Sequence, residues 1–323
     1  MLQHQVVLQK NQIWLEPSFR KGIVKIGNNK HNVIFQKEIQ GSIGTVKMYK
    51  SDNINFCIKF YLSPEKFEKE NILFDKIEGM GLEYIFCKRY NYHLGTTYVH
   101  SLPHTLVLEQ ADCDLFDFTH NELMKSNVSL KTVLSIYRSV IDKLIRLKNN
   151  GLYFIDVKTE NILIKKHKTN SVEIKFCDIS SLYKKGVSND MTFVPPNINC
   201  TIGDNVTSQE LENLIIWQCG VLLLQMLGGN VLEVVPFFIR ENHNLACNLN
   251  YFYRKKDFGK LNVYYNELLE IINLFLCQTK MNTTYSENPV INYCFNPQYY
   301  FSSGYKHSLE NLRQLVIEQI NLL

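Results

Sequence analysis

The sequence predicts an α+β fold with two unequal lobes, a small β-rich N-terminal lobe and a larger helical C-terminal lobe. The order of the segments carries this prediction, because short β-branched alternating stretches come first and long stretches of helical periodicity follow. The length of 323 residues is enough for one large domain or two packed lobes with a substantial core.

The N-terminal part is expected to be rich in strands. Residues 1–35 mix Val, Ile and Phe with Gly-Asn-Asn-Lys, which predicts short strands and turns before the main domain. Alternation over 39–49 and 53–61 predicts consecutive antiparallel strands. A helix over 64–77 follows, with Ser63 as its N-cap and a proline in its first turn. We therefore expect an N-terminal extension at 1–35 and the N-lobe at 36–111.

The remainder, 112–323, is expected to form the helical C-lobe. The buried strand pattern of 105–109 turns polar over 110–115, as in a connector between lobes. A second strand is predicted at 172–177, and the segment 281–306 is expected to be irregular. Helices are predicted over 130–147, about 208–228, about 261–279 and about 307–322.

Composition and charge exclude several classes of protein. A chain that is 45% hydrophobic and 20% charged is typical of a folded protein and not of a disordered one. The net charge of +4 gives weak support for a polyanionic partner and none for a dedicated nucleic-acid binder. Nine cysteines without a Cys-x-x-Cys pair indicate reduced core residues of an intracellular protein.

The chain also lacks the patterns of a targeted or membrane protein. Its first ten residues are too polar for a signal peptide. The longest apolar run, 214–227, is interrupted by Gln218 and Gln225 and is too short to span a bilayer, so we interpret it as a buried core helix. We expect a soluble intracellular protein with no membrane partner.

Two glycines, Gly41 and Gly44, stand at the turn before the predicted pair of antiparallel strands. Glycine lets backbone N–H groups approach a phosphate without an intervening side chain. Two glycines are equally typical of a plain hairpin turn without a ligand, so both interpretations stay open at this point.

Lys59 and Glu70 are a candidate ion pair. Lys59 lies among Phe56, Ile58 and Phe60 in a predicted buried strand, so it either extends out of the sheet or is held by a carboxylate and an anionic ligand. Glu70 borders the apolar stripe of the predicted helix 64–77. The alternative interpretation is that Glu70 lies on a solvated helix face of mixed Glu and Lys.

The stretch 151–164 places Asp156, Lys158 and Asn161 two and three positions apart between apolar residues. By itself it could be any polar loop that leads into a buried strand. Together with the glycine turn, Lys59, Glu70 and Asp178 at the end of the second strand, it resembles the eukaryotic-type protein kinase family.

The resemblance to protein kinases covers roughly residues 36–230. Residues 39–46 read Ile-Gln-Gly-Ser-Ile-Gly-Thr-Val against Gly-x-Gly-x-x-Gly-x-Val, and 56–59 read Phe-Cys-Ile-Lys where Val-Ala-Ile-Lys would stand. Residues 106–109 resemble the hinge, and 214–221 resemble the buried helix of the large lobe. The fold implied is the bilobal protein-kinase-like fold.

The family's chemistry then implies roles for these positions. Asp156 would orient the substrate hydroxyl and Lys158 would steady the transferring phosphate. Asn161 and Asp178 would coordinate Mg²⁺, which prefers oxygen ligands. The lysine two residues after the aspartate is the pattern of serine/threonine kinases. Binding of ATP would fall to Gly41, Gly44, Val46, Lys59, Glu70, Glu109 and Ala111. The implied partners are protein substrates, host or viral, because the divergent motifs are similar to those of virus-encoded kinases, which act in the host cytoplasm or nucleus.

The chain departs from the family pattern at positions that serve support and regulation. Phe154-Ile155 replaces His-Arg before the catalytic aspartate, so control through an activation-loop phosphate is not expected. Asp-Phe-Gly reads Asp178-Ile179-Ser180, Ala-Pro-Glu reads Pro195-Pro196-Asn197, and Ile215 replaces the aspartate before Trp217.

We expect an active serine/threonine kinase, since every group expected to touch ATP, metal or hydroxyl is retained. The alternative is a catalytically weak pseudokinase that acts as an ATP-binding or scaffolding module. A small-molecule kinase is a third hypothesis, but the large insertion near the catalytic loop that marks such enzymes is not visible in the sequence.

Overall fold

The computed structural model is mixed α+β, as the sequence predicts, and it divides into two compact units, Met1–Ala111 (unit 1) and Asp112–Leu323 (unit 2). Most of the described strands belong to unit 1 and most of the described helices to unit 2. The structure describes residues 11–16, 18–26, 28–41, 44–51, 55–96, 104–123, 128–167, 171–185, 206–227, 258–278, 283–284, 286–296 and 307–323.

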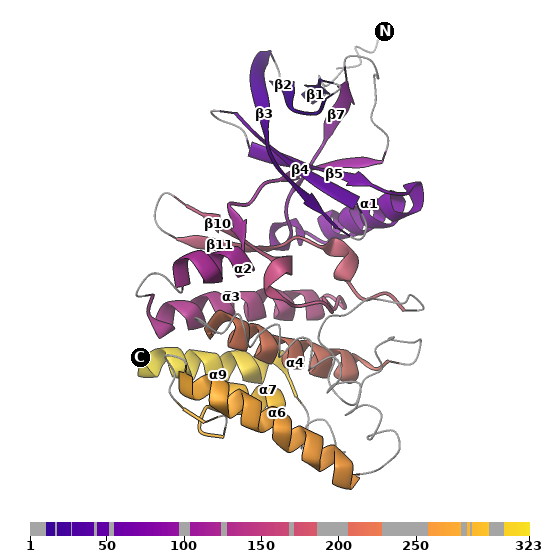
Figure 1. Ribbon diagram of the computed structural model, residues 1–323. Coiled ribbons are helices and arrows are strands. Elements are labelled where there is room, and N and C mark those ends of the chain that lie inside the picture. The colour runs from indigo at the N-terminus through magenta and orange to yellow at the C-terminus, as the bar shows by residue number, and fades with distance from the viewer. Residues whose placement is uncertain are drawn as a thin grey trace. The chain divides into compact units, whose positions relative to one another are not determined.

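Unit 1 is built on one curled sheet with the strand order β6-β8-β5-β4-β3-β2-β1-β7 (Figure 1). The two edge strands are neighbours in the chain, separated only by Asn91, and β7 pairs with β1 in parallel. The sheet therefore curls back on itself. The strands are β1 (Asn11–Leu15), β2 (Lys21–Ile26), β3 (Asn29–Gln40), β4 (Gly44–Lys50), β5 (Asn55–Tyr61), β6 (Arg89–Tyr90), β7 (Tyr92–Thr96) and β8 (Thr105–Glu109).

The expected boundary at residue 35 falls inside β3, which runs unbroken from Asn29 to Gln40. The first half of β3 pairs with β2 and the second half with β4. The strands expected in an N-terminal extension are thus part of the same sheet as the expected N-lobe. The sheet is continuous because backbone hydrogen bonds join neighbouring strands. The pattern of side chains in the sequence does not predict these bonds.

The sheet of unit 1 has one apolar face and one face that meets a helix. Tyr49, Phe56, Ile58 and Val107 belong to a fully buried cluster with residues of β1, β2, β3 and β7. Because side chains alternate along a strand, Lys59 points to the opposite face. On that side lies α1 (Pro64–Gly79), whose N-cap Ser63 accepts a hydrogen bond from the Lys66 N–H, as predicted. A short 3-10 turn, Glu83–Ile85, follows α1.

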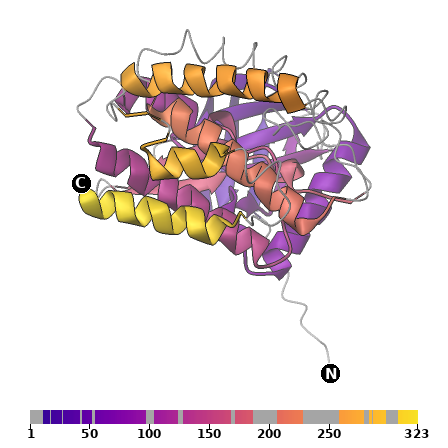
Figure 2. The ribbon, with the colours of Figure 1, turned by 90° about the horizontal axis from the view of Figure 1, so that it is seen from below.

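Unit 2 contains a small sheet, in the order β11-β10-β9, and most of the helices. The strands are β9 (Cys113–Asp114), β10 (Ile162–Lys166) and β11 (Val172–Phe176). The helices are α2 (Leu115–Phe118), α3 (Leu130–Lys148), α4 (Ser208–Leu227), α6 (Phe258–Gln278), α7 (Pro289–Phe295) and α9 (Leu309–Leu322), with one π turn at Thr119–Leu123. Helices α3 and α9 lie side by side in both views (Figures 1 and 2).

Helix α4 is the centre of unit 2. Every residue from Asn213 to Leu227 is buried, and the helix contacts α3, α7 and α9. It is long and apolar enough to cross a membrane, but 89% of its most apolar window is buried, as in the core helix of a soluble protein. At Gly220 a Cβ would lie 2.6 Å from Cys294 Cβ, so the close approach of α4 and α7 requires glycine.

The segment 281–306, expected to be irregular, contains α7, so this expectation was wrong in part. Asn288 caps the helix by accepting hydrogen bonds from the N–H groups of Val290 and Ile291, and Pro289 occupies its first turn. The Asn-Pro pair is itself a helix-start signal. The helices predicted over 130–147, 208–228, 261–279 and 307–322 agree with α3, α4, α6 and α9 within a few residues.

Candidate functional site

The first group of candidate functional residues is a buried ion pair in unit 1. Lys59 Nζ lies 2.7 Å from Glu70 Oε1, and the two residues are only 8% and 2% exposed. Lys59 also lies over the ring of Tyr61, 5.2 Å from its centroid. Lys59 therefore does not extend into solvent, and Glu70 belongs to the buried side of α1 and not to its solvated face.

Glu70 has a polar atom without a partner. Its Oε2 is buried and accepts no hydrogen bond from any described residue. A buried carboxylate oxygen without a donor costs free energy, and the described residues do not compensate this cost. The observed contact of the pair joins α1 to the sheet.

A second contact between helix and sheet fixes the position of α1. All three guanidinium nitrogens of Arg89, on β6, donate to Asn71, Asp75 or Glu78 on α1, and the guanidinium lies over Phe74. Although burial opposes it, hydrogen bonds to Glu78 and Asp75 raise the pKa of Arg89 above its usual value. Arg89 was not among the residues predicted from the sequence; its only signal was the row of acceptors along one face of α1.

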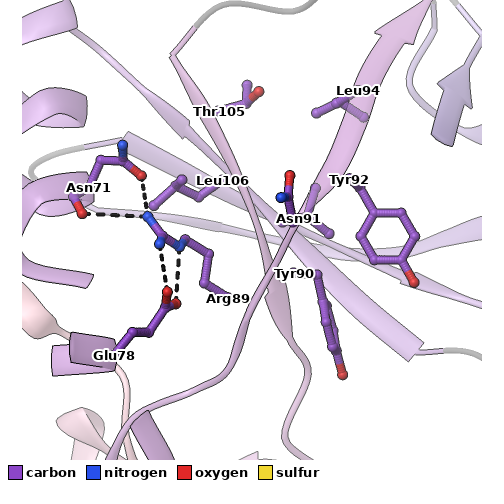
Figure 3. A pocket seen from close by; sticks show the side chains of 10 residues that line it. Asn71, Glu78, Arg89, Tyr90, Asn91, Tyr92, Leu94, Thr105 and Leu106 are labelled. Atoms are coloured by element: carbon purple, nitrogen blue, oxygen red, sulfur yellow. Dashed lines mark hydrogen bonds and ion pairs between the residues drawn. The ribbon is translucent and has the colours of Figure 1, made fainter. Parts of the chain in front are cut away.

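Arg89 also lines a cavity of about 470 Å³ in unit 1 (Figure 3). The cavity lies where β7 diverges from β8, and Tyr90, Tyr92 and Leu106 also border it. Because the Arg89 guanidinium is turned toward α1, its charge is already neutralised there. We assign no ligand to this cavity.

The glycine turn has a structural explanation for one of its two glycines. At Gly44 a Cβ would lie 2.0 Å from the carbonyl oxygen of Phe60, so β4 can approach β5 there only with glycine. At Gly41 a Cβ would meet nothing closer than 3.4 Å, and the Gly41 N–H donates to the Gly44 carbonyl. Ser42 and Ile43 lie outside the described residues.

Val46 and the expected hinge lie next to Lys59 in the sheet. Val46 is directly opposite Lys59 across the β4–β5 pair, so the two side chains share one face. Glu109, at the end of β8, is buried, and its Oε2 accepts a hydrogen bond from the Lys88 N–H. Ala111 is half-buried and ends unit 1. Burial raises the pKa of Cys57, whose Sγ faces the carbonyls of Leu108 and Glu109, to about 12, so this thiol stays protonated.

The second group of candidate functional residues lies in the loop between α3 and β10 of unit 2. Asp156 Oδ2 lies 2.7 Å from Lys158 Nζ and accepts a hydrogen bond of 2.8 Å from Asn161 Nδ2. Asn161 Nδ2 also donates to the Asp156 backbone carbonyl at 2.8 Å. Asp156 and Asn161 are 6% and 8% exposed. The three polar groups of the sequence motif are therefore brought together, with the carboxylate at their centre.

The loop backbone before Asp156 is held by apolar packing. Phe154 is fully buried and stacks on Phe176 of β11, with 4.6 Å between ring centroids. Ile155 packs with Leu211 and Leu214 of α4, and its N–H donates to the Ser181 carbonyl. These contacts give Phe154 and Ile155 a physical role in holding the loop.

Asp178 lies beside Asn161 because of the strand register. Ile162 pairs with Phe176, and the Cys177 N–H donates to the Asn161 carbonyl. The Asp178 carboxylate accepts from Ser180 Oγ at 2.6 Å, from the Ser180 N–H at 3.3 Å and from Ser181 Oγ at 3.2 Å. Both carboxylate oxygens thus point toward the 3-10 turn Ile179–Ser181.

The chemistry of the donors fits Mg²⁺ at Asn161 and less well at Asp178. Because the Asn161 NH₂ group is used by Asp156, its amide oxygen is the atom that it offers to a hard cation. The three serine contacts of Asp178 use most of the lone pairs of its carboxylate and leave fewer of them for the ion. Within the described residues, no group of three or more His, Cys, Asp or Glu side chains is arranged to hold a metal. Pro195-Pro196-Asn197 lies outside the described residues.

No model of a known protein family matches this chain, and no curated protein sequence matches it at the significance required. Its function must therefore be inferred from the contacts of its own residues. One further residue of the site, Gln218 on α4, has its carboxamide bonded to the loop on both sides of Asp156. In the sequence this residue stands out only as an interruption of an apolar run.

Proposed function

We propose that the chain is a serine/threonine protein kinase that transfers the γ-phosphoryl group of ATP to a protein hydroxyl. The observation that carries the proposal is the convergence of Lys158 and Asn161 on one oxygen of Asp156. These two contacts hold the buried Asp156 carboxylate in one orientation. A carboxylate so held can accept a hydrogen bond from a substrate hydroxyl and align it for attack.

Lys158 has two roles in this proposal. Its ammonium group lies 2.7 Å from the Asp156 carboxylate and is itself only partly buried, so it can also contact a transferring phosphate. Phosphoryl transfer depends on positioning and on charge neutralisation more than on covalent chemistry. A lysine two residues after the aspartate resembles the pattern of serine/threonine kinases, and this resemblance supports serine or threonine as the acceptor residue.

The ion pair of unit 1 supports ATP as the donor. Lys59 offers further N–H donors beyond the one used by Glu70, and a lysine ammonium binds phosphate as a point charge. Glu70 fixes its direction. Val46, beside Lys59 on the same face, offers an apolar contact. The roles of Gly41, Gly44, Glu109 and Ala111 in ATP binding rest on the resemblance to protein kinases.

Magnesium is the expected cofactor, and Asn161 and Asp178 are the residues that would hold it. When bound, it neutralises phosphate charge. The role of Asn161 is double, since the same side chain positions Asp156 through its NH₂ group and offers its oxygen to the ion.

The decisive experiment replaces Asp156 with asparagine in the full chain. With Mg²⁺ and radiolabelled ATP, wild-type protein should transfer phosphate to itself or to a basic protein. Asp156→Asn should lower the rate by about 10²–10⁴-fold, the usual value of a positioned acid or base. Glu160→Gln is the matched control, because Glu160 is an exposed carboxylate of the same loop, and it should stay within about twofold of wild type. Unchanged transfer in Asp156→Asn would contradict the assignment.

A pseudokinase is the second candidate, and the serine contacts of Asp178 favour it. A carboxylate already satisfied by three donors binds a metal ion less readily than an open one. This candidate predicts no phosphate transfer by the wild type and no Mg²⁺-dependent rise in melting temperature with ATP. An active kinase should show both effects.

A further inference from the structure

Gln218 is a polar side chain enclosed in the core of unit 2, at 0% exposure, that contacts the loop around Asp156. It projects from the middle of α4, among Ile216, Trp217 and Cys219, which are themselves buried. A polar group placed so deep is costly unless its hydrogen bonds are made. Its contacts therefore decide what it does.

The Gln218 carboxamide uses both of its ends on the loop. Its Nε2 donates to the Ile155 carbonyl at 2.8 Å, and its Oε1 accepts from the Val157 N–H at 3.1 Å. These two backbone groups belong to the residues immediately before and after Asp156. A single side chain thus fixes both neighbours of the candidate catalytic residue.

We propose that Gln218 is a positioning residue that sets the backbone orientation of Asp156, an inference that rests on the proposed function for its catalytic consequence. The Gln218 amide offers, on two adjacent atoms, the donor and the acceptor that the two backbone groups require. An apolar side chain of similar length would leave the Ile155 carbonyl and the Val157 N–H buried without these partners. The loop would then move to find other partners, and Asp156 would move with it.

Three other contacts of the loop do not replace this one. The Ile155 N–H donates to Ser181, and the Asn161 side chain bonds the Asp156 carbonyl, so each acts on a different backbone atom. The bridge between Phe154 and Leu182 ends before Asp156. The Val157 N–H, by contrast, donates to Gln218 itself.

The test compares Gln218→Met with Gln225→Met. Gln225 lies on the same helix and is 8% exposed, but its Oε1 accepts no hydrogen bond from described residues. Both variants remove a buried amide from α4 and keep the length of the side chain. Hydrogen exchange, resolved to the Val157 amide, is measured on the full chain for both variants and for wild type.

Gln218→Met should speed exchange at Val157 by about tenfold or more, as expected for a lost buried hydrogen bond, and Gln225→Met should leave it within about twofold. In the phosphate-transfer assay, Gln218→Met should lower kcat by about 10²-fold while KM for ATP stays within about twofold, because misplacement of a reacting group affects the chemical step. Equal exchange at Val157 in wild type and Gln218→Met, or an unchanged kcat in an active enzyme, would overturn the proposal.

Two further measurements keep the outcomes separate. If wild type transfers no phosphate, the proposed function fails, and the exchange data alone decide whether Gln218 holds the loop. If Gln218→Met does not fold, the wild-type Val157 amide decides instead. It should exchange as slowly as amides of α4 although it lies outside regular secondary structure. Exchange at the rate of an unstructured loop would overturn the inference.

Discussion

Two lysine–glutamate pairs, one buried in unit 1 and one half-buried in unit 2, differ in how fully their atoms are used. In unit 1, Lys59 bonds Glu70 at 2.7 Å, and Glu70 Oε2 has no partner among the described residues. In unit 2, Lys148 of α3 bonds Glu212 of α4 at 2.9 Å and also pairs with Glu310 of α9. Glu212 Oε1 additionally accepts from the Leu309 N–H at 2.7 Å.

The pair of unit 1 joins one strand and one helix, whereas the pair of unit 2 belongs to a network that joins three helices. The Lys148 network connects three helices and caps the first turn of α9. Although burial opposes it, hydrogen bonds to Glu310 and Glu212 raise the pKa of Lys148 above its usual value. The Lys59 pair joins only β5 and α1, and Arg89 already holds α1 to the sheet. In the proposed function the Lys59 pair binds ATP, whereas the Lys148 network only joins helices, and variants of the two pairs test this distinction.

The largest expected effect comes from replacing the first pair with apolar residues. The double variant Lys59→Met, Glu70→Leu should lower phosphate transfer by about 10²-fold or more, because a preorganised charge for the phosphates is lost. Its free energy of unfolding should stay equal or rise, since apolar residues of similar size often replace a buried ion pair without loss. Transfer assays and urea unfolding measure the two effects. A large loss of stability with activity retained would reverse the comparison.

The same design applied to the second pair should have the opposite result. Lys148→Met, Glu212→Leu removes the acceptor of the Leu309 N–H and the partner of Glu310, so the free energy of unfolding should fall by about 2 kcal/mol. Phosphate transfer per folded molecule should match wild type. Urea unfolding gives the first quantity, and a transfer assay at low temperature gives the second. Loss of activity in the folded variant would show that this network also supports the site.

The sequence predicted the Lys59–Glu70 pair because both residues carried a local signal. Lys59 stands in an apolar strand, and Glu70 borders the apolar stripe of a helix, so their geometry follows from strand and helix periodicity. The roles of Asp156, Lys158 and Asn161 were implied by the resemblance to protein kinases and not by their spacing alone, while their closeness in space follows from one short loop. A sequence pattern predicts best the contacts between residues that are only a few positions apart in the chain.

Contacts between distant backbone atoms were not predictable in this way. The parallel pairing of Asn11 with Tyr92, which curls the sheet, uses backbone groups that every residue has. Gln218 bonds backbone atoms of residues far from it in the sequence, so neither Ile155 nor Val157 bears a matching side chain. The hydrogen bond from the Leu309 N–H to Glu212 likewise could not be predicted from the sequence pattern.

The smallest expected effect is a pH dependence of stability that arises from His307 in unit 2 and not from the Lys59–Glu70 pair of unit 1. His307 immediately precedes the N-cap of α9, lies 4.9 Å from the Tyr293 ring and is 1% exposed. Burial lowers the pKa of His307 from its usual 6.5 to about 3. Between those values the unfolded chain binds one more proton than the folded chain. Stability should therefore be fully present above pH 6.5 and fall as the pH decreases, by at most about 1.4 kcal/mol per pH unit from this residue.

The check compares wild type with His307→Phe, which keeps an aromatic ring against Tyr293. Urea unfolding between about pH 7.5 and about pH 5 should show a smaller decrease in stability for His307→Phe than for wild type, since phenylalanine binds no proton. The double variant Lys59→Met, Glu70→Leu should keep the full wild-type slope, because His307 belongs to the α9 junction of unit 2. Equal slopes in wild type and His307→Phe would contradict the lowered pKa. If the slope of unfolding free energy against pH changed only on replacing Lys59 and Glu70, the acid sensitivity would arise in unit 1, which would contradict this prediction.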